Sequence, residues 1–343
     1  KPSASPAAAR IRAAAFFMPG QERPAKNPAK YACEAMNRHS VPRSPDVVKL
    51  DGPFEHQYVH TRGVRLHAAV AGPKNGHLVV LLHGAFGGWF EFRRVIGPLA
   101  ERGYRVAAVD LRGYGMSDKP PAPPQFGIGT LRSDIAGLIP ALGYDDASLV
   151  GVGVGAATAL TVAASHPDRV RTLVSVAGAH PADLRRAMQT KPWNFTWLIG
   201  ETVLRGPYGH LNPTSPQVHA IYRNQLQRDT VLGFLKSRAF EEEYLLRVHH
   251  GEVGGVWPAT VRTSRLLSAS VSPKKTETPI DADVLFIHAG QSLWNPVVAR
   301  TKRRLANDTT LTPFTIPGTK NMPHLEAPQA FSDVVATYLS QRV

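Results

Sequence analysis

The feature that most constrains this chain is an alternation of short apolar runs with helix-like segments from residue 54 onward. Runs such as HLVVLLHG and ADVLFIHAG are continuously apolar and end near a glycine, which is typical of strands buried on both faces. Amphipathic segments such as EFRRVIGPLAERG and GTLRSDIAGLIPALG stand between such runs. Because strands that alternate with helices form mainly parallel sheets, we expect a doubly wound α/β fold.

The chain divides into three parts. Residues 1–52 are rich in Ala, Pro and Arg and form a predicted N-terminal extension. The predicted core comprises residues 53–181 and 280–343. Residues 182–279 interrupt the alternation with several helix-like pieces and many aromatic residues, so we interpret them as a helical cap. Such a cap would cover the carboxyl edge of the sheet, where open α/β folds bind their ligands.

The charge of the chain favours anionic partners. The formal net charge is +14, and the first fifty residues hold nine basic and three acidic residues. We expect the extension and cap to contact another protein or an anionic surface, with solubility as the plainer alternative. Nucleic acid is not an expected partner. A docking role for the extension is also indicated by its apolar side chains, Ile11, Phe16, Phe17, Met18 and Tyr31.

Composition also limits the class of protein. The only cysteine is Cys33, so an internal disulfide framework and a CxxC metal site are excluded. The longest uncharged run, residues 147–164, is interrupted by glycines at a predicted turn, so we expect no transmembrane helix. We expect no cofactor and no metal, and a cytoplasmic location with any membrane association provided by a partner.

Four segments resemble the α/β-hydrolase fold: LLHGAFGGWFEFR, VAAVDLRGYGMSDKP, HPDRVRTLVSVAGAHP and MPHLEAPQAF. The resemblance runs from about residue 54 to the C-terminus and is strongest to actinobacterial epoxide-hydrolase-like proteins. It implies that an active member attacks an epoxide carbon with a carboxylate held at a sharp strand-to-helix elbow. Cap tyrosines would hydrogen-bond to the epoxide oxygen.

The same resemblance assigns the three catalytic positions to residues that cannot perform the chemistry. The nucleophile position is Gly153, which has no side chain, although we expect it to keep the sharp elbow. The acid position is Leu293 and the base position is Asn321, whose amide does not take up a proton at neutral pH. His324 matches the family's second, structural histidine. We therefore predict a degenerate triad and no catalytic residues.

Other residues could still shape a pocket. Backbone N–H groups of an oxyanion hole could survive, with candidates Ala85, Phe86 and Val154. His83 could face the pocket or brace its loop, and Asp183 is the best alternative acid. Three cap tyrosines could face a ligand or simply pack within the cap: Tyr208, Tyr222 and Tyr244.

Three functions remain open at this stage. The first is an inactive α/β-hydrolase-like protein that acts as an interaction or scaffold subunit. The second is a binder of a small hydrophobic molecule in the capped pocket. The third is an active epoxide hydrolase or esterase with a non-standard nucleophile. The basic extension favours the first, because a pocket alone does not need such a segment. We expect the core to fold without residues 1–52.

Overall fold

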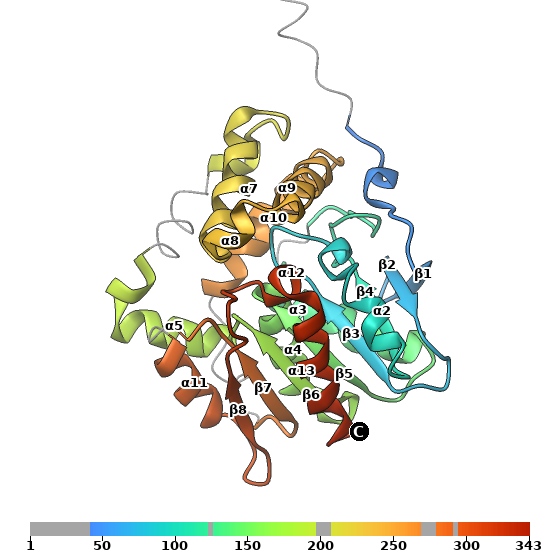
Figure 1. Ribbon diagram of the computed structural model, residues 1–343, viewed down its shortest axis with the longest axis vertical. Helices are drawn as coiled ribbons and strands as arrows, with labels where there is room; N and C mark the ends of the chain where they lie inside the picture. The colour runs from blue at the N-terminus through green and yellow to red at the C-terminus, as the bar shows by residue number, and fades with distance from the viewer. Residues whose placement is uncertain (1–41, 123–125, 197–206, 269–278, 291–293) are drawn as a thin grey trace, which may run out of the picture. The chain divides into compact units, whose positions relative to one another are not determined.

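The structure is a computed structural model that describes residues 42–122, 126–196, 207–268, 279–290 and 294–343 (Figure 1). Three features of the sequence analysis lie outside these residues. They are Cys33, the apolar side chains of the predicted extension, and the predicted acid position Leu293.

An eight-stranded sheet forms the centre of the unit that begins at Pro42. Its order is β1-β2-β4-β3-β5-β6-β7-β8. β2 pairs antiparallel with β1 and β4, and all other neighbours are parallel, which confirms the predicted α/β class. The strands are Glu55–Thr61 (β1), Val64–Ala71 (β2), Leu78–Leu82 (β3), Arg105–Val109 (β4), Ala147–Val152 (β5), Val170–Val176 (β6), Asp283–Ile287 (β7) and Leu311–Phe314 (β8).

Helices cover both faces of the sheet (Figure 1). On one face, Leu131 of α3 (Ile128–Ala141) and Leu160 of α4 (Val154–Ala163) pack into a continuous apolar cluster with the strands. On the other face, Leu99 of α2 (Ile96–Ala100) and Phe331 of α13 (Pro328–Ser340) do the same. Since both faces of β3 and β5 are covered, every residue of these two strands is buried, as their apolar runs predict.

The remaining elements are short or belong to the region between β6 and β7, where the cap is predicted. Within that region lie α5 (Pro181–Thr190), η4 (Pro192–Phe195), η5 (Pro207–His210), α7 (Pro216–Asp229), α8 (Leu232–Leu235), α9 (Arg238–Gly251), α10 (Val256–Ser264) and η6 (Arg265–Ser268). Outside it are η1 (Pro45–Val48), η2 (Trp89–Phe92), η3 (Pro167–Arg169), α11 (Asn295–Lys302) and α12 (Pro323–Glu326).

Local signals explain where the two long helices of this region begin. The hydroxyls of Ser215 and Ser237 accept hydrogen bonds from backbone N–H groups in the first turns of α7 and α9. Pro216 follows the first serine, and its fixed φ suits the first helical position. None of the described helices is long and apolar enough to cross a membrane.

Residues 42–50 pack against the body. Val48 is fully buried, and its carbonyl accepts a hydrogen bond from the Trp89 indole at 3.0 Å. Arg43 forms an ion pair with Glu252, next to the end of α9. The last part of the predicted extension thus packs on the body, with Val48 in its apolar core. That the core folds without residues 1–52 stays a prediction.

A series of hydrogen-bonded polar groups links this segment to the sheet. Asp110 Oδ2 lies 2.9 Å from His67 Nδ1, and His67 Nε2 lies 2.8 Å from His56 Nδ1. His56 Nε2 lies 2.8 Å from the carbonyl oxygen of Leu50. Burial alone would raise the pKa of Asp110, but the hydrogen bond and charge of His67 hold it well below its usual range. Asp110 is therefore an ionised carboxylate, which can accept hydrogen bonds but cannot donate one.

Both ends of this series of contacts are acceptors, so the imidazole of His67 donates to Asp110 and the imidazole of His56 donates to the Leu50 carbonyl. Burial lowers the pKa of His56, which favours its neutral form.

This series of hydrogen bonds predicts a specific effect of replacing His56. In a His56→Phe variant the Leu50 carbonyl loses its donor, so the backbone amides of residues 46–50 should exchange with deuterium at least about fivefold faster. The matched control is His60→Phe on the same strand, where the side chain is exposed. Equal exchange in the two variants would show that His56 does not hold this segment.

Candidate functional site

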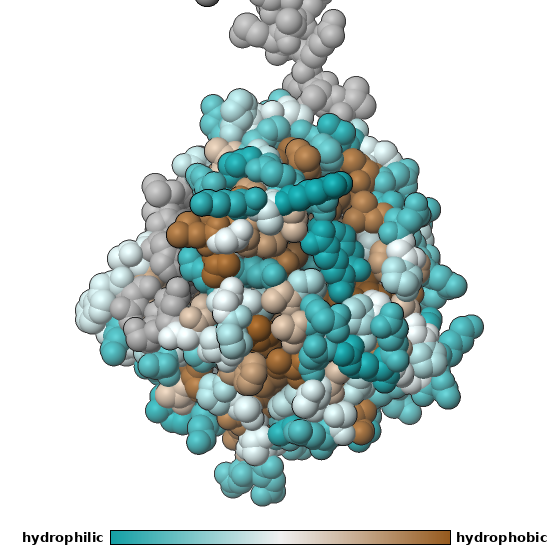
Figure 2. Space-filling view, viewed as in Figure 1, coloured by the Kyte–Doolittle hydropathy of each residue, from teal (hydrophilic) through white to brown (hydrophobic). Residues whose placement is uncertain are grey.

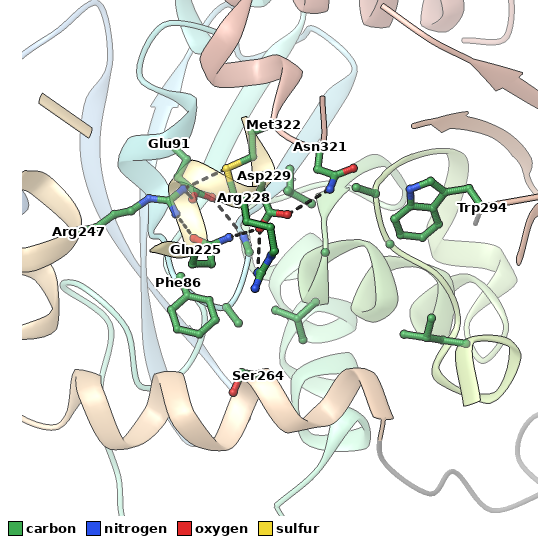
Figure 3. A pocket seen from close by; sticks show the side chains of 18 of the residues that line it. Phe86, Glu91, Gln225, Arg228, Asp229, Arg247, Ser264, Trp294, Asn321 and Met322 are labelled. Carbon is green, nitrogen blue, oxygen red and sulfur yellow. Dashed lines mark hydrogen bonds and ion pairs between the residues drawn. The ribbon is translucent and has the colours of Figure 1, made fainter. Parts of the chain in front are cut away.

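A cavity of about 110 Å³ lies at the carboxyl edge of the sheet, between strand ends and the helices that follow β6. The loops after β3, β5 and β6 contribute to its lining, as do α5, α7, α9 and α10. This is the edge at which open α/β folds bind ligands. Its lining residues are Gly84, Ala85, Phe86, Glu91, Val152, Gly153, Val154, Ala177, Gly178, Leu184, Phe195, Gln225, Arg228, Asp229, Arg247, Ser264, Trp294, Asn321 and Met322 (Figure 3).

Gly153 forms a sharp elbow between β5 and α4, as the sequence analysis predicts. Its φ and ψ are 53° and −110°, a backbone conformation that favours glycine. A Cβ placed on Gly153 would meet no heavy atom within 4 Å. Gly153 thus lines the cavity, and there is space beside it for a side chain that glycine does not have.

The neighbouring glycines are required for packing. A Cβ on Gly151 would lie 2.4 Å from the backbone nitrogen of Ala156, and one on Gly155 would lie 2.2 Å from the carbonyl oxygen of Leu82. These glycines let α4 approach β5 and β3 closely. The architecture of the elbow therefore persists independently of the chemistry that a side chain at Gly153 would supply.

Asn321, the predicted base position, lines the cavity as an amide. Its Nδ2 donates to Asp229 Oδ1 at 3.1 Å, and its backbone nitrogen donates to the Asp229 carbonyl at 3.0 Å. The other oxygen of the Asp229 carboxylate accepts from Gln225 at 2.7 Å and from Arg228 at 3.2 Å. A carboxylate of α7 therefore stands beside the amide and accepts from three donors.

The three oxyanion-hole candidates all line the cavity. Ala85 and Phe86 do so from the loop after β3, and Val154 from the first turn of α4. The backbone N–H of Val154 has no acceptor within its own helix, because the first turn of any helix leaves such groups unpaired. The positive end of the α4 dipole lies at the same place.

The other pocket candidates do not line this cavity. His83 braces its loop: Nδ1 lies 2.6 Å from the Gly84 carbonyl, and Nε2 accepts from the Leu111 backbone at 3.0 Å. Tyr222 is buried with ring contacts to Phe86 and Trp257. Tyr208 and Tyr244 are partly buried at the edge of the core.

The alternative acid Asp183 and the second histidine His324 both have structural surroundings. Both Asp183 oxygens accept from Arg304, at 2.7 and 2.9 Å. His324 is fully buried against the rings of Phe92 and Phe331, and burial lowers its pKa to about 3. Neither residue lines the cavity.

A buried ion-pair cluster closes one side of the cavity. The guanidinium of Arg247 on α9 is fully buried and donates to four side chains. Three of them are labelled in Figure 3, namely Glu91 at 2.5 Å, Gln225 at 2.5 Å and the sulfur of Met322 at 3.5 Å, and the fourth is Glu243 at 3.1 Å. Arg93 pairs with Glu243 at 2.6 Å, so two guanidinium groups face two carboxylates. The cluster ties α7 and α9 to the 3-10 helix η2.

Burial raises the pKa of Glu91 to about 7, against the opposing charge of Arg247. The carboxyl group also accepts a hydrogen bond from the Gly84 backbone at 3.2 Å. A rigid loop at the cavity thus depends on a group that titrates near neutral pH.

Sequence reasoning missed Glu91, Arg247, Asp229 and Trp294, although all four line the cavity. The signal for Arg247 was a single arginine within the apolar stretch YLLRVHH. Trp294 directly follows the predicted acid position. Ala177, directly after β6, has a φ of 44°, which is strained for a residue other than glycine. An alanine in the sequence does not predict such a conformation.

Comparison with known proteins agrees with this arrangement. The sequence model of the α/β hydrolase fold family matches residues 77–328. AB hydrolase superfamily protein YfhM of Bacillus subtilis is 42% identical over 125 residues, 36% of this chain and 44% of that protein. Epoxide hydrolase B of Mycobacterium tuberculosis is 40% identical over 124 residues, 36% of this chain and 35% of that protein. The matched segment spans less than half of either relative.

Solved structures share the fold over a longer stretch. Cfl2 from Burkholderia cenocepacia covers 83% of this chain and 96% of its own, with a TM-score of 0.68 and 23% identity. Epoxide hydrolase VrEH1 from Vigna radiata covers 84% of this chain and 98% of its own, with a TM-score of 0.64 and 20% identity. At such identities the likeness establishes the fold and leaves the activity open.

Replacing Arg247 tests the buried cluster. In Arg247→Leu the carboxylates of Glu91 and Glu243 lose a shared partner inside the protein, so the free energy of unfolding should fall by about 3–5 kcal/mol. The control is Arg238→Leu on the same helix, which removes an exposed ion pair with Glu242 and should leave the free energy of unfolding almost unchanged. Chemical denaturation measures both; similar losses would show that the cluster does not hold the cap.

The raised pKa of Glu91 predicts a pH-dependent difference. Between 4.5 and about 7 the native state keeps a proton that the unfolded state releases, so this group's contribution to stability falls as the pH rises. Glu91→Gln cannot titrate. The melting temperature of the wild type minus that of the variant should therefore be lower at about pH 8 than at about pH 5. A difference that grows with pH would mean that Glu91 is ionised throughout.

Proposed function

We propose, because this chain belongs to the α/β-hydrolase fold family, that it binds a small, largely apolar molecule in the capped cavity without hydrolysing it. One observation carries the proposal. Gly153 stands at the elbow with open space beside it, and the cavity around that space is kept. The architecture that presents a nucleophile is present, and the nucleophile is not.

The chemistry of the remaining residues supports the loss of covalent hydrolysis. Glycine cannot attack carbon, and the amide of Asn321 cannot accept the proton that a nucleophile or water would release. Removal of a nucleophile or its base lowers the rate of such enzymes by about 10⁶-fold. Several relatives are named epoxide hydrolases. We therefore attribute the resemblance to them to common ancestry and not to a shared activity.

The lining supports binding of an apolar molecule. Phe86, Leu184, Phe195, Trp294 and Met322 provide large apolar surfaces in the lining of the cavity. Such a lining with few polar groups is typical of small-molecule sites. A volume of about 110 Å³ limits the ligand to a small ring or a short branched chain.

An interaction role remains the second candidate. Among the described residues between β6 and β7, three large apolar side chains are exposed: Trp193 at 67%, Leu232 at 78% and Leu245 at 49%. Polar side chains cover most of the face drawn in Figure 2, with apolar ones in smaller patches. With the net charge of +14, this supports contact with an acidic protein or an anionic surface in the cytoplasm. Loss of partner capture in Trp193→Ser/Leu232→Ser, with the fold retained, would favour this role.

One experiment tests the primary proposal in two parts. The purified protein should hydrolyse styrene oxide and p-nitrophenyl acetate no faster than its Gly153→Ala variant or buffer alone. The same sample, titrated with benzene, should show shifts of the Met322 methyl signal in a carbon–proton NMR spectrum, because Met322 lines the cavity.

The control fills the cavity. Leu184→Trp replaces an aliphatic side chain of the lining with a larger indole ring, which should fill the space that benzene would occupy. The benzene-dependent shift should then disappear while the melting transition remains cooperative. Turnover of either substrate that is lost in Asp229→Asn would identify a non-standard hydrolase and overturn the proposal. A wild-type spectrum unchanged by benzene would overturn the binding role.

A further inference from the structure

Two polar atoms in the cavity lining have no hydrogen-bond partner within the described part of the chain. One is the indole Nε1 of Trp294, a donor on a side chain that is only 7% exposed. The other is Oδ1 of Asn321, an acceptor whose companion Nδ2 is already bonded to Asp229. Buried donors and acceptors are nearly always paired in folded proteins, so each of these atoms indicates a missing partner.

The two atoms face the same space. In Figure 3 the nitrogen edge of Trp294 is turned toward the side of the cavity that Asn321 occupies. Asn321 is held by Asp229 through both its side chain and its backbone, so its free oxygen has a defined direction. The ring of Trp294 packs against Phe286, with centroids 5.9 Å apart, which holds the indole in place. A donor and an acceptor are thus both presented on rigid supports.

The charges around the cavity favour an uncharged ligand. The lining contains two guanidinium groups, those of Arg228 and Arg247, and two carboxylates, those of Glu91 and Asp229. Arg247 is paired with both Glu91 and Glu243, and Arg228 with Asp229. An anion or a cation would leave water without gaining an unmatched opposite charge, and that loss is large.

We propose, building on the proposed binding function, that the ligand is a small uncharged alcohol with an apolar body. Its hydroxyl oxygen accepts from Trp294 Nε1–H and its hydroxyl proton is donated to Asn321 Oδ1. A hydroxyl is the smallest group that both accepts and donates, so it satisfies both atoms at once. The apolar body then occupies the space beside Gly153 that a catalytic side chain would otherwise fill.

The test compares three ligands with one ring: cyclohexanol, cyclohexane and cyclohexanecarboxylate. Dissociation constants come from the Met322 methyl shift of the full chain near pH 7. Cyclohexanol should bind about tenfold more tightly than cyclohexane, since two hydrogen bonds are added, and cyclohexanecarboxylate should bind most weakly.

Two variants each remove one of the two unpartnered atoms. Trp294→Phe deletes the indole N–H and keeps an aromatic ring. Asn321→Leu deletes the amide oxygen at similar volume, together with the Nδ2 donor to Asp229. Each should reduce the preference for cyclohexanol over cyclohexane by about threefold or more, while the affinity for cyclohexane stays within about twofold. The control is Trp257→Phe, whose indole donates to the Tyr208 carbonyl and does not line the cavity, and which should keep the preference.

The outcomes separate this inference from the proposed function. Equal binding of cyclohexanol and cyclohexane would overturn the alcohol assignment and leave the binding function intact. Tightest binding of the carboxylate would overturn it in favour of an anionic ligand. No binding of any of the three rings, together with no effect of benzene, would overturn both. Because the measured quantity is a ratio of affinities in one variant, a general loss of stability does not imitate the expected result.

Discussion

The fully buried guanidinium of Arg247 is the interaction on which the functional half of this molecule depends. It reaches from α9 to Glu91 in η2, to Gln225 in α7 and to Glu243 one turn away on its own helix. Removing such a charge from water costs several kcal/mol, and only complete pairing offsets that cost. The pairing is complete in one arrangement of α7, α9 and η2. The position of the cavity roof follows from this requirement.

The packing of the elbow constrains the neighbours of Gly153 more than Gly153 itself. Packing of α4 on the sheet requires Gly151 and Gly155, because any side chain there would overlap backbone atoms. Nothing in the packing requires the identity of the residue at Gly153, apart from its backbone conformation. The packing of this turn and the side chain that it presents to the cavity therefore depend on different residues.

Much of the fold could be predicted from local patterns. The buried strands β3 and β5 follow from continuous apolar runs, and the elbow at Gly153 follows from a strand, a glycine-rich turn and a helix in sequence. The bracing role of His83 was one of two alternatives, and the structure places both its ring nitrogens on backbone groups of its own loop and the next. The docking of Val48 under the Trp89 indole could not be predicted, because a short segment without periodicity has no pattern that names its partner.

The amino-acid sequence by itself determined the layered α/β architecture and the absence of a nucleophile at Gly153. Both depend on residue type and on spacing along the chain, which are local. Only the tertiary structure decided that Arg247 meets Glu91 across 156 positions, that Asp229 of the cap satisfies Asn321, and that Trp294 faces the cavity while Tyr222 does not. Those outcomes depend on how separate helices pack in three dimensions. Amphipathic patterns show that a helix has a buried face, but not which charge, ring or cavity that face will meet.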